Sequence, residues 1–179
     1  MLETLTTLVI GASQDIGRRI ATSPVEEGPN RVLVARSDGI YETENLIDIK
    51  DKTPPLKADV TREGSVKNSI GTAVERFGGL DIVVNNAGIP GPTAPVKEVK
   101  AEDWKNHGSK RQKAFFVIKL AAPYLKESNR ASIINISSIS GKMPLEKRTP
   151  YTTSKMAVMG LTGTLVFELG KYDGTINAI

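Results

Sequence analysis

A tyrosine and a lysine stand four residues apart in the segment Tyr151-Thr152-Thr153-Ser154-Lys155. On a helix, this spacing places both side chains on the same face. A lysine ammonium favours the phenolate form of a neighbouring tyrosine, and a phenolate can accept a proton from a substrate. The pair therefore predicts general acid–base chemistry. Taken alone, the same two residue types at helical spacing also fit an ordinary surface helix.

The segment before the tyrosine favours the chemical interpretation. Residues 133–136, three of them isoleucines, predict a strand, which leads into Ser137-Ser138-Ile139-Ser140-Gly141. A serine hydroxyl at the carboxyl end of a strand can donate a hydrogen bond to a substrate oxygen on which negative charge develops. Ser138, Tyr151 and Lys155 therefore form one candidate catalytic set.

A glycine-containing turn follows the first apolar run and reads Ile10-Gly11-Ala12-Ser13-Gln14-Asp15-Ile16-Gly17. A tight turn from a strand into a helix directs free N–H groups and the positive helix end at an anion such as a pyrophosphate. Gly11 would allow the tight turn, and Gly17 would let the helix pack closely on the strand. Two glycines after a strand also occur in turns that bind nothing.

A second turn, Asn85-Asn86-Ala87-Gly88, follows the mostly apolar run 80–84 directly. Asparagine hydrogen-bonds readily to nearby backbone and tolerates left-handed conformations. Ligands bind at the carboxyl ends of the strands in α/β sheets, so the turn is expected to line a ligand. A turn that only stabilises the fold is the alternative.

The elements that must position these residues alternate between two patterns. Short apolar runs bounded by turn residues predict buried strands, and longer segments between them have a helical pattern. This alternation predicts a doubly wound α/β fold with a parallel sheet, in one domain covering residues 1–179. The predicted strands are 5–10, 31–35, 80–84, 132–136 and 175–179, with a further short strand at 57–60, and the predicted helices are 15–27, 62–77, 101–127 and 151–170.

Two of the predicted helices contain an irregular feature. Pro24 removes a backbone hydrogen bond and should end or kink the first helix. Residues 105–113 include no apolar residue although they lie in the middle of a long helical segment. They are interpreted either as a solvated face or as an irregular break.

The composition excludes several classes of site. The 179 residues include no cysteine, which excludes disulfides, thiolate metal sites and cysteine nucleophiles. His107 is the only histidine, so neither a histidine-rich metal site nor a Ser-His-Asp triad is expected. The start of the chain lacks the basic residues of a signal peptide, and no apolar stretch approaches the roughly 20 residues of a membrane span. We therefore expect a cytoplasmic protein without a metal.

The formal net charge of +4 is mild. Its only dense basic cluster, Lys110, Arg111 and Lys113, is more typical of a solvated face than of a nucleic-acid surface. A helical interaction module built on the same stretch is a remote alternative.

Taken in order, these motifs resemble the classical short-chain dehydrogenase/reductase family. The resemblance implies a three-layer Rossmann fold and an NAD(P)-dependent oxidoreductase that acts on a small carbonyl or secondary alcohol. It also implies that Tyr151 is the general acid or base, that Ser138 orients the carbonyl and that Lys155 holds the nicotinamide ribose. By analogy with the family, a homodimer or homotetramer is expected.

The resemblance further implies a set of cofactor-binding residues. An arginine, Arg36, follows Ala35 at the end of the second strand, where members that prefer NAD usually have an acid. An arginine there can pair with a 2′-phosphate, so NADP(H) is favoured over NAD(H), although a surface arginine is the alternative. Asp59 and Val60 match the position that holds the adenine, and Asp59 alone would be a polar strand terminus. The complete set is Gly11, Ser13, Gln14, Ile16, Gly17, Arg36, Asp59, Val60, Asn85, Ala87, Gly88, Tyr151 and Lys155.

The sequence departs from the family pattern at several places. Ile10 replaces the usual threonine, Asp15 the usual middle glycine, and Arg111 the usual asparagine that anchors a proton-relaying water. The substrate-binding lid and last strand of the family are missing, so an incomplete chain or a truncated variant is expected. These departures leave a second interpretation open, in which the protein is a catalytically weak or inactive relative that binds a cofactor or a partner.

Overall fold

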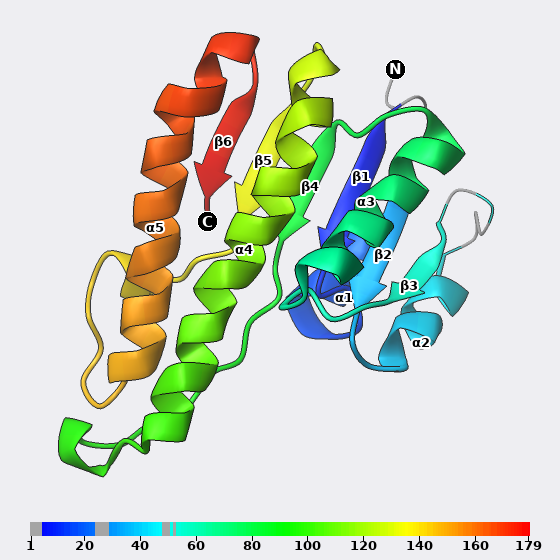
Figure 1. The fold of residues 1–179 in the computed structure, drawn as a ribbon. Coiled ribbons are helices and arrows are strands. Elements are labelled where there is room, and N and C mark those ends of the chain that lie inside the picture. Colours follow the sequence, from blue (N-terminus) through cyan, green and yellow to red (C-terminus); the bar gives the residue numbers. More distant parts are fainter. Residues whose placement is uncertain (1–4, 24–28, 48–50, 52) are drawn as a thin grey trace.

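The computed structural model describes residues 5–23, 29–47, 51 and 53–179, with the side chains of residues 109–112 outside the description. Six strands form one sheet in the order β3-β2-β1-β4-β5-β6 (Figure 1). Every pairing is parallel, and Val9 of β1 is opposite Leu33 of β2 on one side and Val84 of β4 on the other. The strands are β1 (Thr6–Ile10), β2 (Asn30–Ala35), β3 (Pro55–Lys57), β4 (Ile82–Asn85), β5 (Ser132–Asn135) and β6 (Thr175–Ala178).

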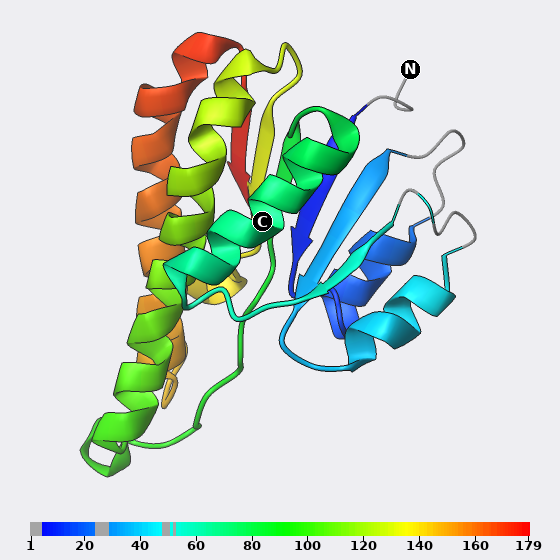
Figure 2. The same cartoon turned by 45° about the vertical axis from the view of Figure 1, so that its right-hand side comes forward.

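The strand order reverses direction at β1, because the chain adds strands first on one side of β1 and then on the other. Right-handed crossovers then place α1 and α2 on one face of the sheet and α3, α4 and α5 on the other (Figures 1 and 2). The reversal opens a crevice at the carboxyl ends of β1 and β4, where ligands bind in such sheets. The helices are α1 (Asp15–Thr22), α2 (Gly39–Asn45), α3 (Glu63–Phe77), α4 (Ala101–Glu127) and α5 (Thr149–Leu169), with short 3-10 turns η2 (Val96–Glu98), η3 (Ile139–Gly141) and η4 (Gly170–Tyr172).

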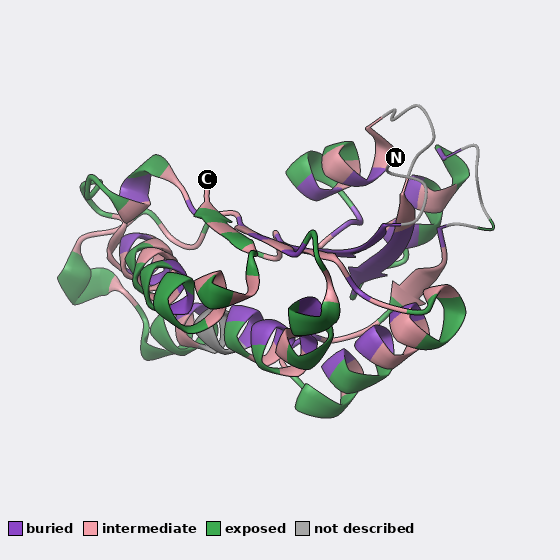
Figure 3. Ribbon diagram, turned by 90° about the horizontal axis from the view of Figure 1, so that it is seen from above, coloured by how far each residue is buried: buried purple, intermediate pink, exposed green. Residues whose placement is uncertain are grey.

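Each face of the sheet has its own apolar core. Leu8 of β1 belongs to a core cluster with residues of α3, α4 and α5, whereas the next residue, Val9, belongs to a cluster with residues of α1 and α2. Successive residues of a strand point to opposite faces, which explains why the predicted strands are continuous apolar runs. Figure 3 shows the buried residues on the strands and on the helix sides that face them. In β6 the pattern changes, and exposed residues alternate with half-buried ones.

The sequence predicted five strands and four helices in nearly their observed places, and the structure differs from it at several points. The first helix ends at Thr22 rather than at residue 27, and the Arg31 guanidinium donates hydrogen bonds to Ala21 O at 2.7 Å and Ser23 O at 3.0 Å at that end. Pro24 lies outside the described residues. The sequence analysis also did not predict α2.

The further short strand predicted at 57–60 is present, but it lies earlier in the chain, at Pro55–Lys57. Asp59 leaves the strand to form a local turn, in which its Oδ1 accepts hydrogen bonds from Thr61 N at 3.0 Å and Thr61 Oγ1 at 2.9 Å. A side chain that bonds its own backbone two residues on competes with the sheet for this segment.

The stretch 105–113 is neither an irregular break nor a wholly solvated face. It is continuous helix within α4. His107 and Lys113 are buried there, with exposed fractions of 3% and 7%. Because both residues are polar, their buried positions could not be recognised from the sequence.

Candidate active site

The glycine turn between β1 and α1 is shaped by close backbone contacts. Gly11 has a φ of +82°, and a Cβ there would lie 2.9 Å from Ala87 N. A Cβ on Gly17 would overlap the Gly11 carbonyl oxygen and the Asn86 side-chain amide. Both glycines are thus required by the packing, in agreement with the tight turn and close helix approach predicted for them.

The Asn-Asn-Ala-Gly turn joins β4 to its neighbours through both asparagines. Asn86 Nδ2 donates to the Gly11 carbonyl oxygen at 3.0 Å, so this side chain holds the glycine turn. Asn85 Nδ2 donates to Asn135 Oδ1 at 2.9 Å, and Asn135 Nδ2 donates to Thr162 Oγ1 at 3.0 Å. The sequence analysis included Asn85 among the cofactor-binding residues and omitted Asn86. The two asparagines have different partners, and nothing in the sequence distinguishes them.

A cavity of about 490 Å³ lies at the carboxyl edge of β1, β2 and β4. Its volume is in the range of pockets that hold small molecules. Of the residues predicted to bind cofactor or substrate, Gly17, Asp59, Asn85 and Ser138 are not in its wall. The predicted residues that do line it are Gly11, Ser13, Gln14, Ile16, Arg36, Val60, Ala87, Gly88, Tyr151 and Lys155.

The charged groups of Arg36, Lys113 and Asp59 interact with one another beside this cavity. Burial lowers the pKa of Lys113, the charge of Arg36 lowers it further, and Asp59 acts in the opposite direction. Partial burial alone would raise the pKa of Asp59, but the hydrogen bonds from Thr61 and the charges of Arg36 and Lys113 outweigh it and hold that pKa below its usual value. Lys113 lines the cavity together with Arg36. The sequence analysis had assigned it to a basic surface cluster.

Asp15 occupies an unusual place at the start of α1. Its φ is +48°, a left-handed conformation that costs an L-residue conformational energy. The side chain is exposed and its residue lines the cavity. Gln14 Nε2 donates to Asp15 Oδ2 at 2.9 Å. The family's usual glycine would adopt this backbone without strain and without adding a negative charge near the cavity.

Tyr151 and Lys155 lie on the first two turns of α5 and both line the cavity. Lys155 Nζ donates to the Ile136 carbonyl oxygen at 2.8 Å and lies 5.7 Å from the centre of the Tyr151 ring. Burial lowers the pKa of Lys155. The structure therefore brings this predicted pair together at the end of β5.

Ser138 begins the 3-10 turn η3, which packs against α5. Its Oγ accepts a hydrogen bond from Ser140 N at 3.2 Å. The neighbouring Ser137, rather than Ser138, is in the cavity wall. The prediction about Arg111 concerns a side chain outside the described residues.

Two further features are absent from the described part of the chain. It contains no group of three or more His, Cys, Asp or Glu residues that could hold a metal ion. None of its helices combines the length and the apolar character needed to cross a bilayer.

Comparison with known proteins decides the family. Residues 5–179 match the family model described as short chain dehydrogenase. The chain belongs to the short-chain dehydrogenase family.

Among curated short-chain dehydrogenases, the 3β-hydroxysteroid dehydrogenase of Mediterraneibacter gnavus is 32% identical over 175 residues, which are 96% of this chain and 63% of that protein. The 3-oxoacyl-[acyl-carrier-protein] reductase of Staphylococcus epidermidis is 34% identical over 177 residues, covering 96% and 72%. The solved structure of an NAD⁺-bound xylitol dehydrogenase superimposes with a TM-score of 0.92 at 28% identity, covering 99% and 69%. The chain thus spans less than two thirds of the first of these relatives.

The cavity of this short-chain dehydrogenase suits a nicotinamide dinucleotide on two structural grounds. The glycine turn packs its backbone against Asn86 and Ala87, because no Cβ would fit at Gly11 or Gly17, and it thereby brings the N-terminus of α1 to the cavity wall. The opposite wall contributes the cations Arg36 and Lys113, which suit a phosphate group. Asp15 is the one feature of the turn that opposes a bound diphosphate.

Proposed function

We propose that this short-chain dehydrogenase transfers a hydride between NADP(H) and a small carbonyl or secondary alcohol. One observation carries the proposal: Tyr151 and Lys155 line the same cavity as the glycine turn. A proton donor and a dinucleotide cradle in one cavity are what a hydride-transfer reaction requires.

The side chains have complementary roles in this proposal. The bound nicotinamide would supply or accept the hydride. Tyr151 donates its phenolic proton to the carbonyl oxygen during reduction and accepts the hydroxyl proton during oxidation. Lys155, held by the Ile136 carbonyl oxygen, keeps a positive charge beside the tyrosine and binds the nicotinamide ribose. Ser138, next in the chain to Ser137 of the cavity wall, would donate a hydrogen bond to the same substrate oxygen and orient it.

Several features support NADP(H) over NAD(H). Ala35 ends β2, so no acid stands there to accept a hydrogen bond from a ribose 2′-hydroxyl. Arg36 follows it at the cavity wall, and the buried Lys113 contributes a second positive charge nearby. Both cations can bond to a 2′-phosphate. Val60, which also lines the cavity, would contact the adenine. Asp59, whose Oδ1 is already engaged by Thr61, has the structural role of closing the turn after β3.

The test measures NADPH oxidation by the full gene product against a panel of ketones, together with Tyr151→Phe. We expect the variant to lose activity by roughly 10²- to 10⁴-fold while its affinity for NADPH is unchanged. Tyr124→Phe removes the hydroxyl of an exposed tyrosine on α4 and serves as a matched control that keeps full activity. Full activity in Tyr151→Phe contradicts the mechanism, and a preference for NADH contradicts the role of Arg36.

A second candidate function is a short-chain dehydrogenase relative that binds cofactor or a partner with little turnover. The observation that favours it is Asp15, with its left-handed backbone and its negative charge at the cavity. Tight NADPH binding without turnover of any ketone in the panel would support this candidate over the enzyme.

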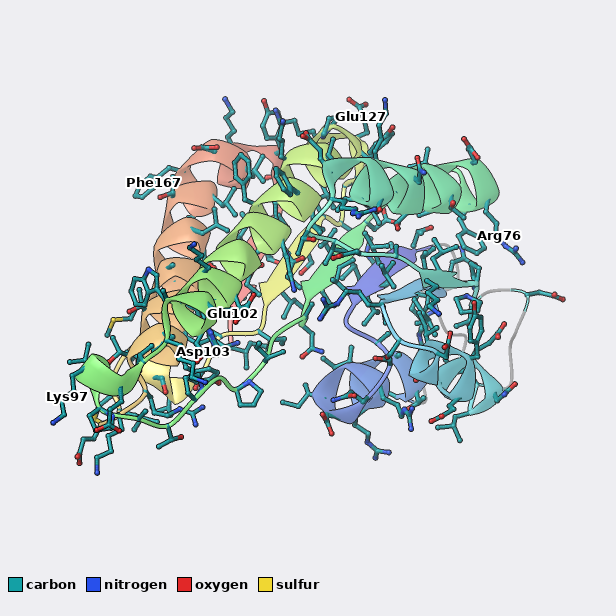
Figure 4. All side chains as sticks on the ribbon, turned by 60° about the horizontal axis from the view of Figure 1, so that its bottom comes forward. Arg76, Lys97, Glu102, Asp103, Glu127 and Phe167 are labelled. Carbon is teal, nitrogen blue, oxygen red and sulfur yellow. The ribbon has the colours of Figure 1, made fainter. Side chains whose placement is uncertain are left out.

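The remaining proposals concern the assembly and its setting. Apolar side chains are exposed on α4 and α5, among them Trp104, Phe115 and Phe167, which is 87% exposed and projects from α5 in Figure 4. They support a homodimer or homotetramer formed through these helices, which light scattering of the full gene product would test. That strands from both ends of the chain share one sheet supports a single domain at 1–179. A cytoplasmic location stays a prediction, to be checked by cell fractionation.

A further inference from the structure

Arg148 is the residue immediately before α5, and its side chain lies over the candidate catalytic tyrosine. Its guanidinium carbon is 4.8 Å from the centre of the Tyr151 ring. Its Nη1 donates to Thr93 Oγ1 at 2.9 Å, and its Nη2 donates to the Pro90 carbonyl oxygen at 2.8 Å. A single side chain thus connects Tyr151 to the loop that follows the Asn-Asn-Ala-Gly turn.

This loop, residues 89–94, forms part of the cavity wall through Ile89 and Pro90. It is held from two other directions as well. Ala94 N donates to the Lys147 carbonyl oxygen at 2.9 Å. On the α4 side, Gly91 approaches the His107 ring so closely that a Cβ would overlap it. The position of Arg148 is therefore fixed relative to both the loop and α5.

The chemistry of an arginine suits this position. A guanidinium is planar, keeps its charge throughout the pH range of enzymes, and stacks on aromatic rings. A phenolate shares its negative charge with its ring, so a cation over the ring face favours that form. In the described part of the chain, the charged groups that face the Tyr151 ring are Arg148 at 4.8 Å and Lys155 at 5.7 Å. Arg148 is the nearer of the two to the ring centre.

We propose that Arg148 is a positioning residue for Tyr151, which holds the phenol ring and the 89–94 loop in one geometry and places a positive charge over the ring. The proposal rests on the proposed function, because it assumes that Tyr151 exchanges the substrate proton. Arg148 has two separable effects in this proposal. The pair of hydrogen bonds from Nη1 and Nη2, called the fork below, holds the loop, and the positive charge acts on the ring.

Three variants of the full gene product separate these components. Arg148→Met removes the fork and the charge at similar length, Arg148→Lys keeps the charge and loses the fork, and Thr93→Val removes the Nη1 acceptor alone. For alcohol oxidation we expect Arg148→Met to lower kcat roughly three- to tenfold with little change in the KM for the cofactor. The pH of half-maximal activity should rise, because the phenolate is the active form in this direction. Arg148→Lys should restore that pH, and Thr93→Val should leave it unchanged.

A second readout does not depend on turnover. The ultraviolet absorbance of tyrosinate, taken as the difference between each protein and its Tyr151→Phe counterpart, reports the ionisation of Tyr151 in the cofactor-free protein. We expect its midpoint to rise in Arg148→Met, because the cation over the ring is lost, and to return in Arg148→Lys. If the full gene product reduces no ketone but this midpoint moves, the proposed function fails and the role of Arg148 stands.

The opposite results overturn the proposal. An unchanged midpoint in Arg148→Met shows that the charge does not act on Tyr151. If Thr93→Val reproduces the kinetics of Arg148→Met, the arginine acts only by holding the loop. Should Arg148→Met fail to fold, Arg148→Gln takes its place, because it also removes the charge, and an unchanged midpoint in that variant overturns the proposal.

Discussion

The side-chain amide of Asn86 donates a hydrogen bond of 3.0 Å to the carbonyl oxygen of Gly11. This bond ties the end of β4 to the glycine turn that ends β1, and the backbone N–H of Asn86 donates to the Ile10 carbonyl oxygen at 3.1 Å. Gly17 lies against both partners of the side-chain bond. The proposed pyrophosphate turn is therefore shaped by a neighbouring strand as well as by its own glycines.

The contact of Gly17 with this bond predicts a large effect of a single methyl group. In Gly17→Ala the new Cβ overlaps the Gly11 carbonyl oxygen and the Asn86 amide, so the turn must move. We expect a loss of about 2–3 kcal/mol in the free energy of unfolding and at least a tenfold weaker affinity for NADPH. Denaturant unfolding and fluorescence titration measure the two quantities.

A matched control is available within α3. A Cβ on Gly71 would meet no atom within 4 Å, so Gly71→Ala should gain about 0.5–1 kcal/mol from helix propensity. Its affinity for NADPH should be unchanged. Equal stability losses in the two variants would show that the Gly17 contact is not the cause.

Asp15 predicts that two substitutions will improve the proposed cofactor site. Asp15→Gly removes the left-handed strain, worth about 1 kcal/mol, and also removes the negative charge. Asp15→Asn removes the charge and leaves a side chain that tolerates this backbone. Because the charge is lost in both, we expect both to bind NADPH roughly three- to tenfold more tightly.

Thermal unfolding separates strain from charge in these two variants. Only Asp15→Gly should gain stability, because Asp15→Asn loses a favourable interaction with the α1 N-terminus, worth roughly 0.5 kcal/mol, without relieving strain. Unchanged NADPH affinity in both variants would mean that the Asp15 carboxylate does not face the bound diphosphate.

Lys113 predicts opposite changes in stability and in binding. Burial lowers its pKa in the folded protein, so the cost of the buried charge is fully present below the folded pKa and disappears as the pH rises toward about 10.4, the unfolded value. Lys113→Met should therefore be more stable by about 1 kcal/mol at neutral pH, with a gain that shrinks as the pH approaches 10. Unfolding free energies across this pH range test the sign.

The same variant should bind NADPH about tenfold more weakly and NADH equally well, because only NADPH carries the 2′-phosphate. Arg36→Met is the companion variant, since its exposed side chain has no comparable burial cost and should change the preference without the gain in stability. If both affinities fall equally in Lys113→Met, the ammonium contacts a part of the cofactor that NADH shares.

The buried Asn135 links β4 to α5 and predicts a loss of stability. Asn135→Ala leaves the Asn85 amide without its acceptor and opens a void, at an expected cost of about 2–4 kcal/mol. Thr162→Val removes the acceptor of the Asn135 amide, together with the bond from the Thr162 hydroxyl to the Val158 carbonyl oxygen, and should cost about 1–2 kcal/mol. Chemical denaturation of the two variants measures the difference, and a larger loss in Thr162→Val would contradict this order.

The sequence by itself determined the order and type of most elements, because each depends on local patterns. Continuous apolar runs identified five strands of the parallel sheet, and the spacing of Tyr151 and Lys155 placed both on one helical face. Gly11 and Gly17 were identifiable because a missing side chain has the same meaning in any tight turn. The end of β3 could not be identified from the sequence, because Asp59 could either continue the strand or bond to Thr61.

The tertiary structure alone decided which side chains serve the site from distant parts of the chain. Asn86 and Gly11 are 75 residues apart, and Arg148 and Thr93 are 55 apart. The neighbouring charges in the sequence placed Lys113 on a charged surface, but the packing of α4 buries it beside the cavity. Such contacts depend on which strands become neighbours and on how a helix is rotated about its axis. Residue type and local spacing carry neither quantity, and both are set by the packing of the whole sheet.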